Sequence, residues 1–297
     1  MNYPAKFSAC LFLLTLTACS VEKNFEAKKS EIIVSGDERI KMLRTKNIEI
    51  IEKELASANK NTLFITDITD VLLEPKSQLF KTPNEALLNR FLNDFISKGC
   101  GQNKLEREKV FSIVVQQPVE PVDENFVRII RELQERNVKV LALTNGLIGS
   151  FGYIDSMEDF SIQQLNDLGY HLENSWSELK SITLTLESGK QILFKNGVIF
   201  VSKLTSKASK GECLLAFLEH IRIQPKKIIF VDDKRKNLES VAEIARKIGA
   251  RFVGIEYTGA LEKKNDPISD KHAQLQLSIL EKEHKLLSDD EIESMLR

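Results

Sequence analysis

Three apolar runs of this sequence end in side chains that could take part in phosphoryl transfer. The first run ends at Asp67, the second at Thr144 and the third at the pair Asp232-Asp233, while Lys210 opens a helical pattern before the third run. A carboxylate can attack phosphorus and form an acyl phosphate. Hydroxyl and ammonium groups can hold the other phosphoryl oxygens, and carboxylates can bind Mg²⁺, which offsets negative charge. These residue types favour a Mg²⁺-assisted phosphoryl-transfer site.

The same runs are typical of buried strands that alternate with helices. The apolar runs cover residues 62–66, 138–143, 227–231 and 251–255. Helical spacing of apolar residues is found at 37–59, 84–98, 124–136, 208–221 and 237–248. This alternation predicts an α/β fold with a mainly parallel sheet flanked by helices. Ligands bind such sheets at the carboxyl ends of the strands, so we expect the polar residues to meet there.

One stretch differs from the alternation. Residues 180–203 alternate apolar and polar side chains and contain the turn dipeptides Ser188-Gly189 and Asn196-Gly197. This pattern predicts antiparallel β-hairpins. The single Trp176 precedes them, and it either packs in the interior or stacks on a base or sugar of a ligand.

The order and spacing of the polar groups resemble the four motifs of the haloacid dehalogenase (HAD) superfamily of phosphohydrolases. The motifs correspond here to residues 63–71 (LFITDITDV), 143–145 (LTN), 209–211 (SKG) and 229–233 (IFVDD), with Asn237 four residues further on. The chain is also similar to a poorly characterised HAD-like family in bacteria. The resemblance implies a HAD-like Rossmannoid core that carries cap insertions, and it names no substrate.

The resemblance also implies a role for each motif residue. Asp67 is the nucleophile, and its aspartyl phosphate is the intermediate. The implied metal ligands are Asp67, the backbone carbonyl of Thr69, Asp232 and, directly or behind them, Asp233. The implied phosphate-binding groups are Thr144, Lys210 and the backbone N–H of Asn145. The implied cofactor is Mg²⁺, and the implied substrate is a small phosphorylated molecule.

Thr69 departs from the HAD pattern. HAD phosphatases usually carry an Asp two residues after the nucleophile, which protonates the leaving alcohol and later activates water. Thr at this position is similar to the P-type ATPases, whose aspartyl phosphate is long-lived. General acid–base catalysis contributes about 10²–10⁴-fold, so its loss would slow turnover by that order. Asp70, Glu74 or a cap residue could replace the missing acid, although strand alternation would point Asp70 away from Asp67.

Three functions are compatible with this set of residues. The first and preferred one is a Mg²⁺-dependent phosphomonoester hydrolase. The second is a non-catalytic binding or interaction protein on the same fold, and the third is a phosphotransferase or slow phosphoenzyme. Intact Asp67, Thr144, Lys210 and Asp232 favour the first and third, whereas Thr69 favours the second and third. The scarcity of ATP outside the cytoplasm weakens the third.

The N-terminus resembles a bacterial lipoprotein signal. A positively charged start precedes an apolar run at residues 7–16 that is too short to span a bilayer. The run ends in Leu-Thr-Ala-Cys, which resembles a lipobox and implies a cleaved signal peptide at residues 1–18 with diacylglycerol on Cys19. The implied location is the periplasmic side of the cell envelope, and Ser20 favours the outer membrane. The alternatives are a plain signal peptide or a buried helix with an incidental Cys.

Length and composition limit the remaining choices. The chain has 297 residues, a net charge of −1 and 42% hydrophobic residues, which excludes disorder and gives no electrostatic footprint for nucleic acid. The predicted organisation is a tether at 19–36, a core at 37–265 and a helical tail at 266–297. Cap insertions are expected at about 72–120, mainly helical, and at about 150–200, with the hairpins. The tail either packs on the core or binds a partner as an amphipathic helix.

Overall fold

The fold is described from a computed structural model of the chain. The residues described are 31–34, 38–90, 104–201, 208–263 and 268–297. The predicted signal peptide, the lipobox with Cys19 and most of the predicted tether lie outside these ranges. The second half of the predicted helix at 84–98 lies outside them as well, while residues 85–90 are helical.

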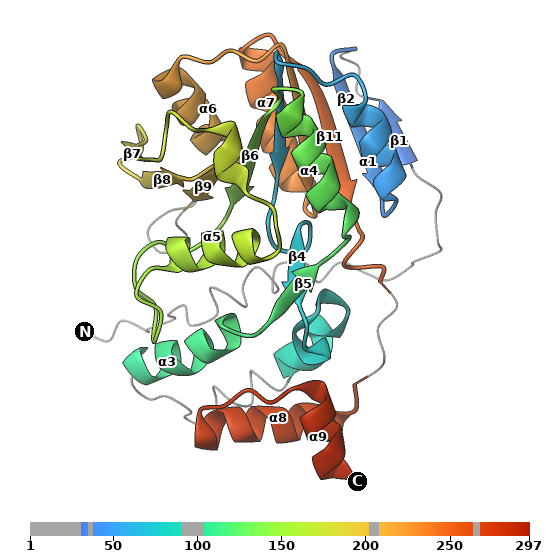
Figure 1. Cartoon of the computed structure of the whole chain (residues 1–297), viewed down its shortest axis with the longest axis vertical. Helices are drawn as coiled ribbons and strands as arrows, with labels where there is room; N and C mark the ends of the chain where they lie inside the picture. The colour runs from blue at the N-terminus through green and yellow to red at the C-terminus, as the bar shows by residue number, and fades with distance from the viewer. Residues whose placement is uncertain (1–30, 35–37, 91–103, 202–207, 264–267) are drawn as a thin grey trace, which may run out of the picture.

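A nine-stranded sheet forms the upper part of the molecule in the view of Figure 1. Its strands are β1 (Glu31–Val34), β2 (Ile40–Thr45), β3 (Thr62–Thr66), β6 (Lys139–Thr144), β7 (Ser181–Thr185), β8 (Gln191–Lys195), β9 (Val198–Val201), β10 (Lys227–Asp232) and β11 (Arg251–Tyr257). The order across the sheet is β1-β2-β11-β10-β3-β6-β9-β8-β7. Every neighbouring pair from β2 to β9 is parallel, and the two edges are antiparallel. The predicted α/β fold with a mainly parallel sheet is confirmed.

Helices cover both faces of the sheet. The helical elements between the strands are α1 (Ile48–Leu55), α4 (Asn125–Glu135), α5 (Met157–Asp167), the 3₁₀ turn η4 (Leu172–Ser175), α6 (Lys210–Ile221) and α7 (Arg235–Lys247). Neighbouring side chains of a strand point to opposite faces. Phe64 therefore packs with α1 and α4, whereas Leu63 and Ile65 pack with α6 and α7. Both faces of β3 are buried, which explains its uninterrupted apolar sequence.

The single helix predicted at 37–59 is wrong. Residues 40–45 form β2, and only residues 48–55 form a helix, α1. Ile40 and Leu43 satisfy helical spacing, but they lie on a strand that pairs with β11. The end of the predicted tether also differs, because residues 31–34 pair with β2 as β1.

The predicted hairpins are present, and they extend the main sheet. β7 pairs with β8 and β8 pairs with β9 in antiparallel register, with Gly189 and Gly197 at positive φ in the two turns. β9 also pairs in parallel with β6. Trp176 packs edge-on against Phe194 and Phe217, which stack on each other, and its indole N–H donates to the Val140 carbonyl. The packed alternative for Trp176 is therefore the one observed.

The segment between β3 and α4 stands beyond the carboxyl ends of the central strands (Figure 1). We call its described residues, 73–90 and 104–121, the β4–β5 segment. Its elements are β4 (Leu73–Pro75), the 3₁₀ turns η2 (Gln78–Phe80) and η3 (Thr82–Asn84), α3 (Lys104–Val115) and β5 (Val119–Pro121). β4 and β5 form a separate two-stranded sheet, and the buried Lys81 ammonium joins them through Glu74 and Glu120.

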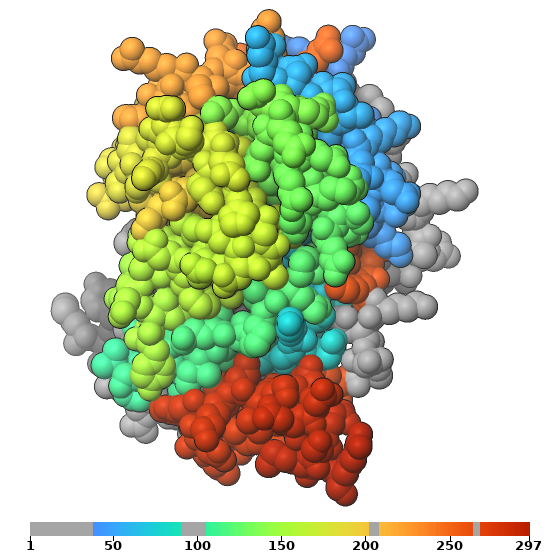
Figure 2. Space-filling view, viewed as in Figure 1, coloured from blue at the N-terminus to red at the C-terminus, as the bar shows by residue number. Residues whose placement is uncertain are grey.

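The C-terminal helices α8 (Asp270–Glu283) and α9 (Asp289–Leu296) pack on the β4–β5 segment rather than on the sheet (Figure 2). Ala273, Leu277 and Leu280 of α8 share one apolar cluster with residues of η2 and α3. A capping box of Ser288 and Glu291 opens α9.

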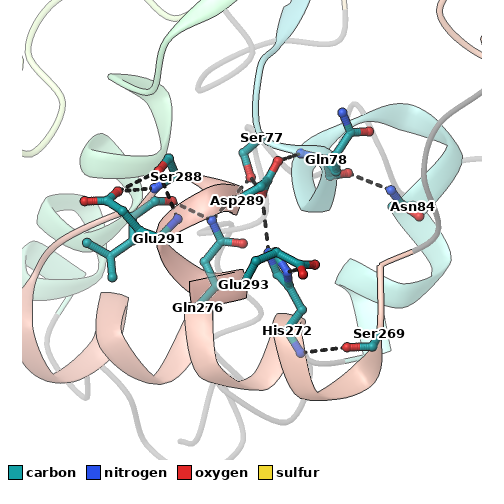
Figure 3. A network of polar contacts seen from close by, with 11 residues as sticks. Ser77, Gln78, Asn84, Ser269, His272, Gln276, Ser288, Asp289, Glu291 and Glu293 are labelled. Carbon is teal, nitrogen blue, oxygen red and sulfur yellow. Dashed lines mark hydrogen bonds and ion pairs between the residues drawn. The ribbon is translucent and has the colours of Figure 1, made fainter. Parts of the chain in front are cut away.

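A polar network also joins the C-terminal helices to the β4–β5 segment (Figure 3). The Asp289 carboxylate accepts hydrogen bonds from the Ser77 hydroxyl at 3.1 Å and the Gln78 backbone N–H at 2.8 Å. It also lies 3.3 Å from Nε2 of the buried His272. The start of η2 is thus held by a residue more than 200 positions away in the chain.

Candidate metal and phosphoryl-transfer site

Strand order brings the carboxylates of Asp67 and Asp232 together. β3 and β10 are parallel neighbours, and Thr66 pairs with Val231 in their register. The next residue on each strand is therefore one of the two carboxylates. The backbone N–H of Asp67 donates to the Val231 carbonyl at 2.9 Å, so the pairing continues up to the site.

Lys210 lies between these two carboxylates. Its Nζ atom is 2.7 Å from Oδ2 of Asp67 and 2.7 Å from Oδ2 of Asp232. Its side chain has no exposed surface. Lys210 is the first residue of α6, and a capping box of Ser209 and Glu212 fixes where that helix begins.

The electrostatics of this ion pair are dominated by burial. Burial raises the pKa of Asp232 above its ordinary value, Lys210 opposes the rise, and Asp67 and Asp233 add to it. Burial alone would lower the pKa of Lys210, but Asp232 and Asp67 outweigh that effect and raise it. The ammonium of Lys210 therefore stays charged and balances a cluster of carboxylates.

The acidic group fits a divalent cation. One oxygen each of Asp67, Asp232 and Asp233 lie within 4.8 Å of one another. The Asp232 Oδ1 atom accepts hydrogen bonds from the Asn237 amide and the Lys234 backbone N–H, each at 2.8 Å, which orients its carboxylate. The Asp233 Oδ1 atom is buried and has no hydrogen-bond partner. Such an unpaired buried acceptor is costly unless a ligand satisfies it, and carboxylate oxygens suit hard cations.

A pocket opens above the acidic group. Its core side is lined by Asp67, Thr69, Asp70, Thr144 and Asn145, and its opposite wall comes from the β4–β5 segment and α5. The predicted nucleophile and the predicted phosphate-binding Thr144 and Asn145 thus face one space. Lys210, Asp232 and Asp233 lie behind this surface, where Lys210 contacts both strands.

Gly146 has a steric role at the end of β6. A Cβ atom at this position would lie 2.9 Å from the Phe200 ring and 3.3 Å from the Thr144 methyl group. A side chain there would displace one of them, so glycine lets the backbone approach the Thr144 end of the pocket.

Strand alternation predicted that Asp70 points away from Asp67, and this prediction is wrong. Alternation stops at the end of β3, because Asp70 adopts a left-handed conformation with φ of 63°. Asp70 lines the same pocket as Asp67, and its Oδ1 accepts a hydrogen bond from the Thr82 hydroxyl at 2.8 Å. Burial, helped by the charge of Asp233, raises the pKa of Asp70 from 3.8 to about 7, against the effect of the Thr82 hydrogen bond.

Lys234 is a site residue that the sequence patterns did not single out. Its ammonium lies 3.0 Å from Oδ2 of Asp233 and it lines the pocket. Burial would lower the pKa of Lys234, but Asp233 and Asp67 raise it. The sequence signal that could have identified Lys234 is its position directly after Asp232-Asp233.

The fold and this site define an α/β protein with a Rossmann-like sheet and a buried acidic triad at the carboxyl ends of its strands. The chain belongs to the family described as "Protein of unknown function (DUF2608)", which matches residues 44–293. No solved structure matches the chain significantly.

Three relatives are similar to the chain over most of their length. An uncharacterized protein of Rickettsia prowazekii is 24% identical over 83% of this chain and 87% of its own. Two proteins named "Putative outer membrane protein" come from Chlamydia pneumoniae and Chlamydia trachomatis. They are 22% and 23% identical over 85% and 76% of this chain, which is 88% and 80% of their own length. Within the described ranges, no helix of this chain has the length and hydrophobicity needed to cross a bilayer.

The raised pKa of Asp70 leads to a prediction on stability. The folded protein keeps this proton up to about pH 7, whereas an unfolded chain releases it near pH 4. The folded state binds more protons between these values, so the free energy of unfolding falls as pH rises. Asp70→Asn keeps an acceptor for Thr82 and suits the left-handed backbone. In EDTA it should match the wild type near pH 4 and exceed it by up to about 4 kcal/mol at pH 8.

Urea unfolding at both pH values measures this difference. Asp155→Asn is the matched control, because Asp155 is exposed and the change removes the same charge. Its free energy of unfolding should stay within about 0.5 kcal/mol of the wild type. Equal stability of Asp70→Asn and the wild type at pH 8 would contradict the raised pKa.

Proposed function

We propose that this protein is a Mg²⁺-dependent phosphomonoester hydrolase of the HAD type that works through an aspartyl phosphate on Asp67. The observation that carries the proposal is the Lys210 ammonium, buried 2.7 Å from both Asp67 and Asp232 at the ends of adjacent strands. A buried cation shared by two carboxylates adds little stability compared with apolar packing. Perturbed charges grouped beside a pocket are typical of active sites.

Asp67 would be the nucleophile. One carboxylate oxygen attacks phosphorus, and the bond from phosphorus to the ester oxygen breaks. The leaving alkoxide takes up a proton from water and departs as the alcohol. Water then attacks the phosphorus of the acyl phosphate, which releases inorganic phosphate and restores the carboxylate. The Ile68 backbone N–H donates to Asp67 Oδ1 at 2.8 Å, and Lys210 holds Oδ2, so the nucleophile is oriented before substrate arrives.

Asp67, Asp232 and Asp233 would hold the cation, with the Thr69 carbonyl as the further ligand implied by the resemblance. When bound, Mg²⁺ supplies charge neutralisation between the carboxylate and the phosphoryl group. The Thr144 hydroxyl and the Asn145 backbone N–H, which line the pocket, would bind the phosphoryl oxygens. Lys210 acts from behind, where its ammonium lies 2.7 Å from Oδ2 of Asp67 and orients that carboxylate.

Thr69 favours a second candidate, a slow phosphoenzyme. Thr69 is exposed in the pocket at the position where HAD phosphatases carry their acid–base Asp. A threonine hydroxyl does not exchange a proton with the alcohol or water at neutral pH. Hydrolysis of the aspartyl phosphate would then be slow, and the phosphorylated protein would accumulate.

Removing the nucleophile tests the phosphohydrolase proposal. Wild-type protein with Mg²⁺ should release phosphate from at least one member of a phosphomonoester panel. Asp67→Asn cannot form the acyl phosphate, so phosphate release should fall to background, and EDTA should have the same effect. Asp155→Asn should retain wild-type activity. Turnover that survives in Asp67→Asn would refute the assigned nucleophile.

Thr69→Asp separates the two candidates. A carboxylate at this position restores general acid–base catalysis, so turnover should increase by about 10²–10⁴-fold. If the wild type is a slow phosphoenzyme, rapid-quench measurements should show a burst followed by slow release, and Thr69→Asp should abolish the burst. Thr69→Ser is the control and should behave as the wild type. An unchanged rate in Thr69→Asp would show that another group already supplies the proton.

We further propose that the protein is lipid-anchored at Cys19 on the periplasmic side of the outer membrane. The lipobox supports this location, and so do the names of the two Chlamydia relatives. Cys19→Ser removes the acceptor thiol, so fatty-acid labelling should disappear and the protein should leave the membrane fraction. A protein that stays in the membrane fraction without label would contradict the lipid anchor.

A further inference from the structure

The wall of the pocket that faces the acidic group is largely apolar. Eight of its lining residues belong to the β4–β5 segment, and seven of these are apolar, among them Leu73, Phe80, Phe111, Val114, Val115 and Val119. Phe80 and Phe111 are buried, and they also belong to the apolar cluster that contacts α8. The wall is therefore built into the packing of the β4–β5 segment and the C-terminal helices.

The charges of the pocket lie on the opposite, core side. Among the described residues that line it, the charged ones are Asp67, Asp70 and Lys234. The Lys234 ammonium already pairs with Asp233 at 3.0 Å. No lining residue of the β4–β5 segment within the described ranges is charged. A second anionic group on a substrate would therefore lose its hydration without gaining a cation as a partner. This desolvation costs free energy.

Gln117 is the polar residue that the β4–β5 segment contributes to this wall, and α5 contributes Ser161 and Gln164. Gln117 is buried and lines the pocket, and its Oε1 atom has no hydrogen-bond partner. An unpaired buried acceptor favours a ligand that carries a hydrogen-bond donor, such as a hydroxyl or amide.

We propose that the leaving group of the substrate is an uncharged, predominantly apolar alcohol that lies against this wall. The inference rests on the proposed phosphohydrolase function, since Asp67 and Thr144 hold the phosphoryl end in the same pocket. It excludes nucleotides and phosphorylated carboxylic acids as preferred substrates.

A series of n-alkyl phosphates from ethyl to hexyl tests the proposal on the full chain with Mg²⁺. Each buried methylene should raise kcat/KM by about fourfold until the pocket is filled. Hexyl phosphate that carries a carboxylate at its ω-carbon is the matched charged substrate. Its kcat/KM should be lower than that of hexyl phosphate by about 10²-fold, because the carboxylate loses its hydration. A flat series, or a preference for the carboxylate, would overturn the inference while leaving the phosphohydrolase function intact.

Val114→Lys probes the wall directly, because Val114 is half-buried and lines the pocket. It should reduce the gain per methylene and raise kcat/KM for the ω-carboxylate by about tenfold. Gln116→Lys is the matched control, since Gln116 is exposed two residues further on and adds the same charge. An equal response of both variants would show a general charge effect and would refute the proposal that the leaving group lies against this wall. The wild-type series still decides the matter if Val114→Lys fails to fold.

Calorimetry with n-alkylphosphonates from ethyl to hexyl separates the two proposals if no phosphate is released. Affinity that rises with chain length would support the apolar wall and overturn the hydrolase function. Affinity that is absent or independent of chain length would overturn both.

Discussion

The Lys210 ammonium, held between Asp67 and Asp232, is the interaction on which the site depends. Two parallel strands that lie side by side present a carboxylate at the same level, and their charges repel. A cation must therefore be buried with them, and Lys210 reaches them from the first turn of α6. The ends of three elements are fixed at one point by this arrangement.

The surroundings of this ion pair indicate that it serves the reactivity of the site more than the stability of the fold. Hydrogen bonds from Asn237 and Lys234 orient Asp232, but Asp233 keeps a buried oxygen without a partner. The carboxylates therefore exceed what the neighbouring donors satisfy. A divalent cation would offset this excess of negative charge and satisfy the unpaired oxygen, which links the electrostatics of the folded chain to its proposed reaction.

The sequence predicted most strands of the sheet and the polar residues that meet at their ends, because both depend on local signals. Apolar runs such as 62–66 are buried on both faces, and polar residues that end neighbouring parallel strands must meet. The prediction of β2 failed because six residues with mixed burial also satisfy helical spacing. The position of Asp70 was missed because it depends on a left-handed backbone at one residue, which alternation does not encode.

The wall of the pocket could not be predicted for a different reason. Phe80 and Phe111 are placed by packing against α8, and Asp289 holds the start of η2, so distant parts of the chain build the wall together. Such contacts leave no periodic pattern in either segment. The proposed nucleophile Asp67 and the neighbouring Asp232 are placed by adjacent strands, whereas the surface that would select the alcohol arises from contacts between remote segments. For this reason the type of reaction can be inferred from the motifs, while the class of substrate can be inferred only from the folded chain.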